Sequence, residues 1–314
     1  MSMSDSSEPS AMNFNIHILG CGSALPTLRH HASSQVVEIH DKCSMIDCGE
    51  GTQMQLRRSH IHFSKISRIF ISHLHGDHCY GLPGMISSFG MLGRTAPLHL
   101  YGPKNLWQMV KPMLELSGHG IDYPLEMHEV DTTRHQLVCE DRSMEVWSIP
   151  LEHRMPCCGY LFREKPKLPH LRRDIIDMFG ISISQAGNIK NGADGITPDG
   201  ERIPNHLLVT PASKPRSYAY CSDTRYLPHL HELIEGVDLL YHESTYAEDN
   251  AALAEKYMHS TARQAAQVAA DAHAGRLLLG HYSQRYEDER LLLDEARQLF
   301  LATELTNEGQ VITL

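Results

Sequence analysis

The chain has 314 residues, a formal net charge of −10, 41% hydrophobic residues and 21% charged residues. This composition is that of an ordinary globular protein, long enough for one large domain or two small ones. It contains no apolar run long enough to span a bilayer, and its acidic balance argues weakly against a nucleic-acid partner. Residues 1–12 are rich in serine and lack the apolar core of a signal peptide, so we expect a disordered lead-in. The eight cysteines form no C-x-x-C pair, which indicates reduced thiols and a cytoplasmic protein.

The first elements are expected to be strands. Alternating apolar and polar residues predict a half-buried strand at 13–19, and residues 35–39 and 44–47 predict a hairpin. A short helix is expected to begin at Thr52. Asp47 stands at a strand end beside glycine-rich turns. It could orient a metal-binding histidine by accepting that ring's second N–H, or it could be an ordinary turn residue.

The most informative stretch is an H-x-H-x-D-H pattern made by His73, His75, Asp77 and His78. It lies between a predicted strand at 66–71 and an apolar helix at 81–92, so it occupies a strand-to-helix loop where chemistry is often found. Imidazole and carboxylate groups suit zinc, manganese or iron. The two first histidines would point the same way from extended backbone, and the glycine at 76 would let the chain aim the other two groups elsewhere. One loop could thus serve two adjacent metals, although a polar surface loop is the ordinary alternative.

Further metal ligands should follow later strands, because one short loop cannot complete two coordination spheres. His153 follows a predicted strand at 144–149, Asp223 follows one at 218–221, and His281 follows one at 276–280. Each residue alone would be an ordinary polar residue after a strand. All three in order, together with the central pattern, predict a metal site with two ions. Strands separated by amphipathic helices indicate a layered α/β architecture with mixed sheets.

On these motifs the chain resembles the metallo-β-lactamase fold, and its later segments resemble tRNase Z, the endonuclease that trims the 3′ end of precursor tRNA. The resemblance covers residues 13 to about 295. It implies a four-layer αββα sandwich with two mixed β-sheets and a protruding arm, and it implies two zinc ions per subunit, with manganese or iron as alternatives. It also implies the metal ligands: His73, His75 and His153 for one ion, Asp77, His78 and His281 for the other, and Asp223 bridging both.

Two metal ions roughly 3.5–4 Å apart would activate a water for attack on a phosphodiester. In members of the family, the residue that matches Asp77 is the proton acceptor, so the resemblance implies this role for Asp77. A general acid must then protonate the leaving alkoxide. Glu243, after a predicted buried strand, and His259, before a helix capped by Ser260 or Thr261, suit this task. The ordinary alternatives are a surface acid and a polar residue at a helix start, but residues 242–245 and 259–262 resemble tRNase Z, in which the Glu and His form this relay.

Residues 163–214 form a long segment interrupted by prolines and glycines, in which 171–179 could form one short helix. Such a segment is either functional or a solvated linker. In tRNase Z an arm inserted at this position binds the tRNA, so the resemblance implies precursor tRNA as partner. It also implies a homodimer in which one subunit's arm serves the other's active site. The candidate substrate-binding residues are Lys165, Lys167, Arg172 and Arg173 in the segment, and Arg285 outside it.

We therefore expect residues 13–314 to form a zinc-dependent endoribonuclease that removes the 3′ trailer of precursor tRNA and leaves a 3′-hydroxyl. One alternative is a hydrolase of the same fold that acts on small phosphodiesters or sulfate esters, against which the arm and His259 argue. The other is a non-catalytic metal-binding or RNA-binding protein, against which the complete ligand set argues.

Overall fold

The computed structural model describes residues 13–25, 27–116 and 121–314. The expected lead-in at 1–12 lies outside these residues. The chain divides into two compact units: a main unit of Met1–Arg163 with Arg216–Leu314, and an inserted unit, Glu164–Pro215. No helix in the described parts of the chain is long and apolar enough to cross a bilayer.

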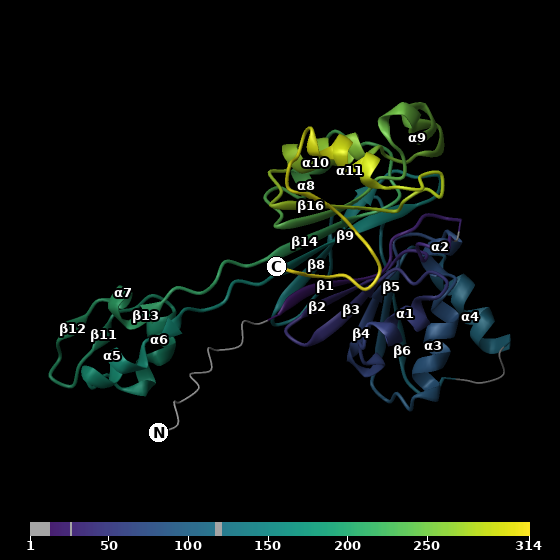
Figure 1. Cartoon of the computed structure of the whole chain (residues 1–314). Coiled ribbons are helices and arrows are strands. Elements are labelled where there is room, and N and C mark those ends of the chain that lie inside the picture. The colour runs from purple at the N-terminus through teal and green to yellow at the C-terminus, as the bar shows by residue number, and fades with distance from the viewer. Residues whose placement is uncertain (1–12, 26, 117–120) are drawn as a thin grey trace, which may run out of the picture. The chain divides into compact units, whose positions relative to one another are not determined.

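Two seven-stranded sheets form the centre of the main unit (Figure 1). The first sheet has the order β18-β1-β2-β3-β4-β5-β6, with antiparallel pairs from β18 to β3 and parallel pairs from β3 to β6. Its strands are β1 (Phe14–Gly20), β2 (Ser34–Ile39), β3 (Lys42–Ile46), β4 (Ile66–Phe70), β5 (Leu98–Gly102), β6 (Leu125–Glu129) and β18 (Val311–Thr313).

The second sheet has the order β17-β16-β15-β14-β9-β8-β7. Strands β14 to β17 run parallel, whereas β9 pairs antiparallel with β14 and β7 pairs antiparallel with β8. Its strands are β7 (Leu137–Glu140), β8 (Met144–Leu151), β9 (Cys157–Glu164), β14 (Ser217–Cys221), β15 (Leu239–Glu243), β16 (Arg276–Gly280) and β17 (Thr303–Leu305). Both sheets are therefore mixed.

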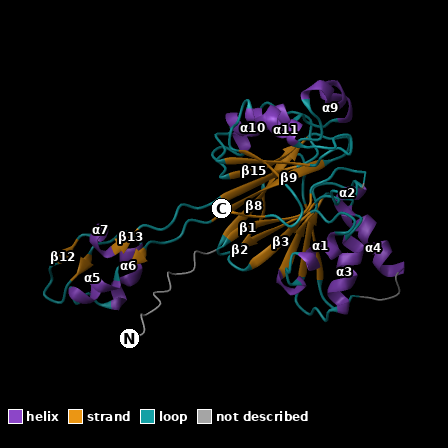
Figure 2. Ribbon diagram, viewed as in Figure 1, coloured by secondary structure: helices purple, strands orange, loops and turns teal. Residues whose placement is uncertain are grey.

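Helices cover the outer face of each sheet (Figure 2). Helices α1 (Thr52–Arg58), α3 (Leu82–Met91) and α4 (Leu106–Leu116) share an apolar cluster with the first sheet. Residues of α8 (Leu230–Leu233), α10 (Ala262–Asp271) and α11 (Arg290–Arg297) belong to the large cluster that also fills the space between the sheets. The expected four-layer αββα sandwich is confirmed. The remaining short elements of this unit are η1 (Phe63–Lys65), α2 (Gly76–Cys79), η3 (Glu248–Asn250) and α9 (Ala251–Tyr257).

Local sequence explains the elements that carry the site. In β1, Phe14, Ile16 and Ile18 are fully buried, as the alternating pattern predicts. Helix α10 begins at a capping box in which Thr261 accepts from the backbone of Gln264, whose side chain accepts from the Thr261 N–H. The cap fixes the start of the helix, and so the position of the residues just before it.

The inserted unit has a small apolar core of its own, made by Ile176, Ile181, Ile189, Ile203 and Leu208. The short helix expected at 171–179 is present as α5 (Arg173–Met178), and two small sheets and further helices, which were not expected, also enclose that core. Its elements are β10 (His170–Leu171), α5 (Arg173–Met178), η2 (Ile183–Gln185), α6 (Ala186–Lys190), β11 (Gly195–Ile196), β12 (Arg202–Ile203), α7 (Asn205–Leu208) and β13 (Val209–Thr210). Strand β10 pairs with β13, and β11 pairs with β12.

Candidate metal centre and active site

The predicted metal ligands lie on loops and a short helix that follow strands of the main unit. The chain leaves β4, passes through His73 and His75, and enters α2, which carries Asp77 and His78. The other three, His153, Asp223 and His281, follow β8, β14 and β16. The structure brings all seven residues together in two groups that share Asp223.

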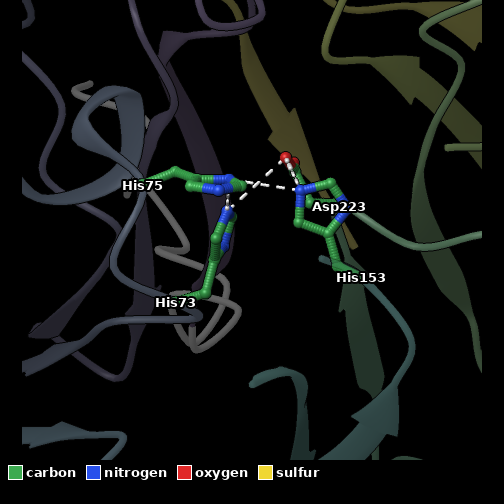
Figure 3. A group of neighbouring side chains, drawn as sticks. All are labelled: His73, His75, His153 and Asp223. Carbon is green, nitrogen blue, oxygen red and sulfur yellow. Dashed lines mark hydrogen bonds and ion pairs between the residues drawn. The ribbon is translucent and has the colours of Figure 1, made fainter. Parts of the chain in front are cut away.

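The first group consists of His73, His75, His153 and Asp223, whose ligand atoms converge (Figure 3). His75 Nδ1 lies 3.0 Å from His73 Nε2 and 3.2 Å from His153 Nε2. Asp223 Oδ2 lies 3.5 Å from His73 Nε2 and 3.6 Å from His153 Nε2. Residues from three separate segments therefore direct their ligand atoms at one point.

The second group consists of Asp77, His78, His281 and the same Asp223, which uses its other oxygen here. Asp223 Oδ1 lies 3.2 Å from His78 Nε2 and 3.0 Å from His281 Nε2. Asp77 Oδ2 lies 3.3 Å from His78 Nε2 and 3.4 Å from His281 Nε2. The two oxygens of Asp223 thus face different groups, as a bridging carboxylate requires.

The donor atoms fit divalent metal ions. Tetrahedral zinc with Zn–N distances of about 2.0–2.1 Å holds neighbouring ligand atoms about 3.3 Å apart, and the separations in both groups are close to that value. His78 Nε2 is buried and lies 3.2 and 3.3 Å from carboxylate oxygens of Asp223 and Asp77, but it makes no hydrogen bond of good geometry with any described residue. Such a nitrogen suits a metal ligand. The cluster therefore has the donor atoms that a metal site requires.

The protonation of the first group also suits metal binding. Burial, followed by the neighbouring imidazole of His78, lowers the pKa of His73 well below its usual value. Burial likewise lowers the pKa of His75 and of His153. These rings are therefore neutral at physiological pH, and a neutral imidazole is the form that binds a metal ion.

Hydrogen bonds on the far nitrogens fix the ligand rings. His78 Nδ1 donates to Asp47 Oδ2 at 2.7 Å, so Asp47 occupies the orienting position considered from the sequence. Asp47 also accepts from the Ser72 N–H at 2.8 Å, from the Ser72 hydroxyl at 2.9 Å and from the Tyr220 hydroxyl at 2.8 Å. This carboxylate is completely buried and fully hydrogen-bonded, so it holds His78 in a single orientation.

Two orienting groups are absent from the sequence prediction. Thr245 Oγ1 lies 2.8 Å from His281 Nδ1, and the Met258 carbonyl accepts from His153 Nδ1 at 2.9 Å. Thr245 stands next but one to Glu243, so its position was a usable signal. Met258 acts through its backbone, and no sequence pattern marks a carbonyl.

Several of these residues have strained backbone. Asp47, Asp223, Met258 and His281 all have positive φ angles, at 56°, 59°, 57° and 59°. A left-handed conformation costs a residue with a side chain about 1–2 kcal/mol. Such strain persists where the surrounding structure imposes it, and it concentrates at functional sites. Here it turns the chain sharply after β14 and β16, so that the next side chain points into the site.

Glu243 and His259 form the pair expected from the sequence. Glu243 Oε1 lies 2.9 Å from His259 Nδ1 and accepts from the Thr224 N–H at 2.7 Å, while Oε2 accepts from the Thr245 hydroxyl at 2.6 Å. Burial lowers the pKa of His259, but the charge and hydrogen bond of Glu243 outweigh it and raise that pKa to about 9. The Glu243 contact occupies Nδ1, so Nε2 is the atom from which His259 can donate a proton.

An open cleft of about 880 Å³ leads to these groups. Arg285, a predicted substrate-binding residue, lines it, and so does Arg154, which belongs to no motif of the sequence. The other predicted substrate-binding residues belong to the inserted unit. There Lys167 Nζ lies 3.4 Å from Glu164, and Arg172 lies 3.7 Å from Asp174. The cleft itself is lined by Ser23, Ala24, Leu25, Ala32, Glu50, His75, Gly76, Asp77, Tyr80, His153, Arg154, Asp223, Thr245, Tyr246, Tyr257, His259, His281, Ser283, Gln284 and Arg285.

The fold and the paired donor groups place the chain among the hydrolases of the metallo-β-lactamase fold. The family described as the anti-Pycsar protein Apyc1 matches residues 14–163, and the beta-lactamase superfamily domain matches residues 207–282. The chain belongs to the ribonuclease Z family. It is 54% identical over 302 residues to a protein named Ribonuclease Z from Parabacteroides distasonis, an alignment that covers 96% of this chain and 99% of that protein.

Other relatives agree with this assignment. A Ribonuclease Z from Bacteroides fragilis is 53% identical over 301 residues and covers 96% of this chain and 99% of its own. Among solved structures, the short form of human tRNase Z matches with a TM-score of 0.68 and 25% identity, covering 95% of this chain and 98% of that one. The resemblance stated from the motifs is confirmed.

Proposed function

We propose that this protein is the endoribonuclease that removes the 3′ trailer of precursor tRNA by hydrolysing a phosphodiester bond with two zinc ions, leaving a 3′-hydroxyl on the tRNA. The observation that carries this proposal is the pair of donor groups sharing Asp223, with the Glu243–His259 pair beside them. Membership of the ribonuclease Z family and similarity to human tRNase Z support precursor tRNA as the substrate. Zinc suits the nitrogen-rich donor set, and manganese or iron are the alternatives.

Two metal ions at these groups would lower the pKa of a water between them and stabilise negative charge on the phosphoryl oxygens. Asp77 would accept the proton that the water loses. Its Oδ2 faces His78 and His281, and the residue lines the cleft from which the substrate enters. Burial raises the pKa of Asp77, but these two histidines more than offset it and lower that pKa well below its usual value.

His259 would protonate the leaving oxygen of the RNA. The pKa of about 9 means that its imidazole carries the proton at neutral pH. Glu243 serves as the positioning residue for His259, because the Thr224 N–H and the Thr245 hydroxyl hold both of its oxygens in place. Thr245 also contacts His281, so the same small network orients the proton donor and one metal ligand.

The direct test is to incubate the purified protein with a precursor tRNA that carries a 3′ trailer, with and without a chelator, and to map both new ends. We expect one cut that leaves a 3′-hydroxyl on the tRNA, loss of cleavage with the chelator, and recovery when zinc is added back. A protein that leaves this RNA intact but hydrolyses bis(p-nitrophenyl) phosphate would be the small-ester hydrolase considered as the alternative. A protein that binds the RNA without cutting either substrate would be the non-catalytic alternative.

The homodimer and the cytoplasmic location stay predictions. All eight cysteines are free thiols, which suits a reducing compartment.

If the inserted unit of one subunit serves the cleft of its partner, two inactive proteins can complement each other. One would carry His259→Ala with an intact inserted unit, and the other would keep its cleft but lack Lys165 to Lys214.

Mixing the two proteins under conditions of subunit exchange should restore precursor tRNA cleavage. With random pairing, about a quarter of the clefts combine an intact active site with an intact inserted unit from the partner. Single-turnover cleavage by the mixture is the measurement, and each protein alone is the control. A mixture as inactive as its parts, in which sedimentation shows that mixed dimers have formed, would show that each inserted unit serves its own subunit.

A further inference from the structure

Tyr80 is a large aromatic residue that the chemistry described above does not use. It is 68% exposed and lines the cleft. It stands at the carboxyl end of α2, the short helix that carries Asp77 and His78. The other two tyrosines that line the cleft are less exposed, since Tyr246 is buried and Tyr257 is half-buried.

The ring of Tyr80 packs against the backbone of its own helix. A Cβ added to Gly76 would lie only 2.4 Å from Tyr80 Cε2, so the ring packs directly against the Cα of Gly76. The Tyr80 N–H also donates to the Gly76 carbonyl at 2.9 Å, which closes the turn. No other aromatic ring or cation stacks on Tyr80 among the described residues. One side of the ring is thus held in place, and the rest is open to the cleft.

We propose that Tyr80 is the binding surface for a nucleobase, on which an unpaired nucleotide next to the scissile phosphodiester stacks. The inference rests on the proposed function, since it concerns how that RNA is held. Asp77 and Tyr80 are separated by one turn of helix, a rise of about 4.5 Å, so a base on this ring lies close to the reacting phosphate. Single-stranded RNA is commonly held by bases stacked on aromatic side chains, and every base has a face that can stack.

Removing only the hydroxyl group of Tyr80 and removing its whole ring should have different effects on cleavage. A stacking surface needs the ring alone, so Tyr80→Phe should cleave precursor tRNA nearly as well as wild type. Tyr80→Ala should lower kcat/KM for precursor tRNA by about 5- to 150-fold, the range that loss of one base–aromatic stack produces. Metal content should stay at the wild-type value in both variants. Met91→Ala serves as the matched control, because Met91 is 80% exposed on α3 and does not line the cleft.

The sharper experiment removes the base instead of the ring. Precursor tRNAs with a single abasic nucleotide, placed in turn on each side of the cleavage site, are cut by wild type and by Tyr80→Ala. At one position, removing the base should lower wild-type cleavage by the same factor by which Tyr80→Ala lowers cleavage of the intact RNA. With that abasic substrate, wild type and Tyr80→Ala should cleave at the same rate. That position identifies the nucleotide that stacks on Tyr80.

The outcomes separate this inference from the proposed function. If wild type does not cut precursor tRNA, the proposed function fails. If wild type cuts it and Tyr80→Ala cuts it equally well, or if the effect of the substitution persists with every abasic substrate, the stacking inference fails. Should Tyr80→Ala disturb α2 and lower the metal content, Tyr80→Leu carries the test, because leucine covers Gly76 and offers no aromatic ring.

Discussion

Replacing Asp77 with alanine will reduce both metal content and cleavage, whereas replacing His259 with alanine will leave the metals bound and slow only the cleavage of RNA. Asp77 directs Oδ2 at the second donor group, so its loss removes a proposed metal ligand together with the proposed proton acceptor. His259 is not one of the proposed ligands, although its ring packs beside the rings of His153 and His281. It hydrogen-bonds to Glu243, whose oxygens are also held by Thr224 and Thr245. Its loss therefore leaves every proposed ligand in place.

The expected size of the His259 effect is about 10²–10⁴-fold on the cleavage rate, the usual contribution of a general acid. Metal content measured by mass spectrometry should remain at two ions per chain in this variant and fall in the Asp77 variant. The two proteins should also differ with bis(p-nitrophenyl) phosphate, whose leaving group departs without protonation. The His259 variant should hydrolyse this ester at close to the wild-type rate, and the Asp77 variant should not.

Glu243→Gln is the matched control for the proton donor. Glutamine keeps the size of the side chain but removes the charge that raises the pKa of His259. Its rate should fall between those of wild type and His259→Ala, again with two metals bound. Cleavage of precursor tRNA by His259→Ala at the wild-type rate would show that another group protonates the leaving oxygen.

Most elements that position the site could be predicted from the sequence. The strands before Asp223 and His281 are largely apolar runs ended by small residues, and the strand before His153 shows alternating burial. Strand β9 escaped prediction although it is long. Nearly all of its residues are buried, so it lacks the alternation that marks a half-exposed strand. The edge strand β18 is only three residues long, and its pairing with β1 joins opposite ends of the chain. Neither feature leaves a local pattern.

The geometry of the site could be predicted only in part. The sequence indicates which residue types follow which strands, but the sharing of Asp223 between two groups depends on the positive φ of that residue and on contacts between distant segments. Asparagine, aspartate and histidine are enriched at positive φ, but most aspartates have other conformations, so an aspartate alone does not predict one. The contact between Thr245 and His281 likewise depends on the pairing of two neighbouring parallel strands, β15 and β16.

The inserted unit is the part of the fold that could be predicted least well from the sequence. Its core residues, among them Ile176, Ile189 and Leu208, are spread over elements of two to six residues. No window of the sequence is long enough to show a helical or strand period there. A folded unit therefore looks like a linker in sequence. This finding matters for any experiment on the segment, because a deletion that stops at Asn205 would leave Leu208 and β13 behind without their core.

The structure shows where a deletion of the inserted unit should begin and end. Arg163 of β9 and Ser217 of β14 are cross-strand partners, so the two ends of the main unit lie next to each other. Replacing Lys165 to Lys214 with a short Gly-Ser linker should therefore close like a hairpin loop. None of the proposed ligands lies in the removed span, so the protein should still bind its metals and hydrolyse bis(p-nitrophenyl) phosphate at the wild-type rate.

Precursor tRNA, by contrast, should be processed very poorly by this variant, mainly because it binds weakly. Each phosphate contact contributes a slope of about −0.7 to −0.9 in a plot of log affinity against log salt concentration, so the loss of four such contacts flattens the plot by about 3. The four predicted substrate-binding residues of the unit can be tested without deleting its core by changing Lys165, Lys167, Arg172 and Arg173 together to glutamine. Arg134→Gln, an exposed arginine of the main unit, is the control.

Comparing the deletion variant with the quadruple variant separates the contribution of the four charges from that of the rest of the inserted unit. If the quadruple variant loses as much affinity as the deletion, the unit binds RNA chiefly through these charges, whereas a milder loss would assign part of the binding to the rest of its surface. Affinities are measured at several salt concentrations, since a single value cannot distinguish the two. Equal affinity of the deletion variant and wild type for precursor tRNA, at every salt concentration, would reduce the unit to a spacer and reopen the small-ester hydrolase alternative.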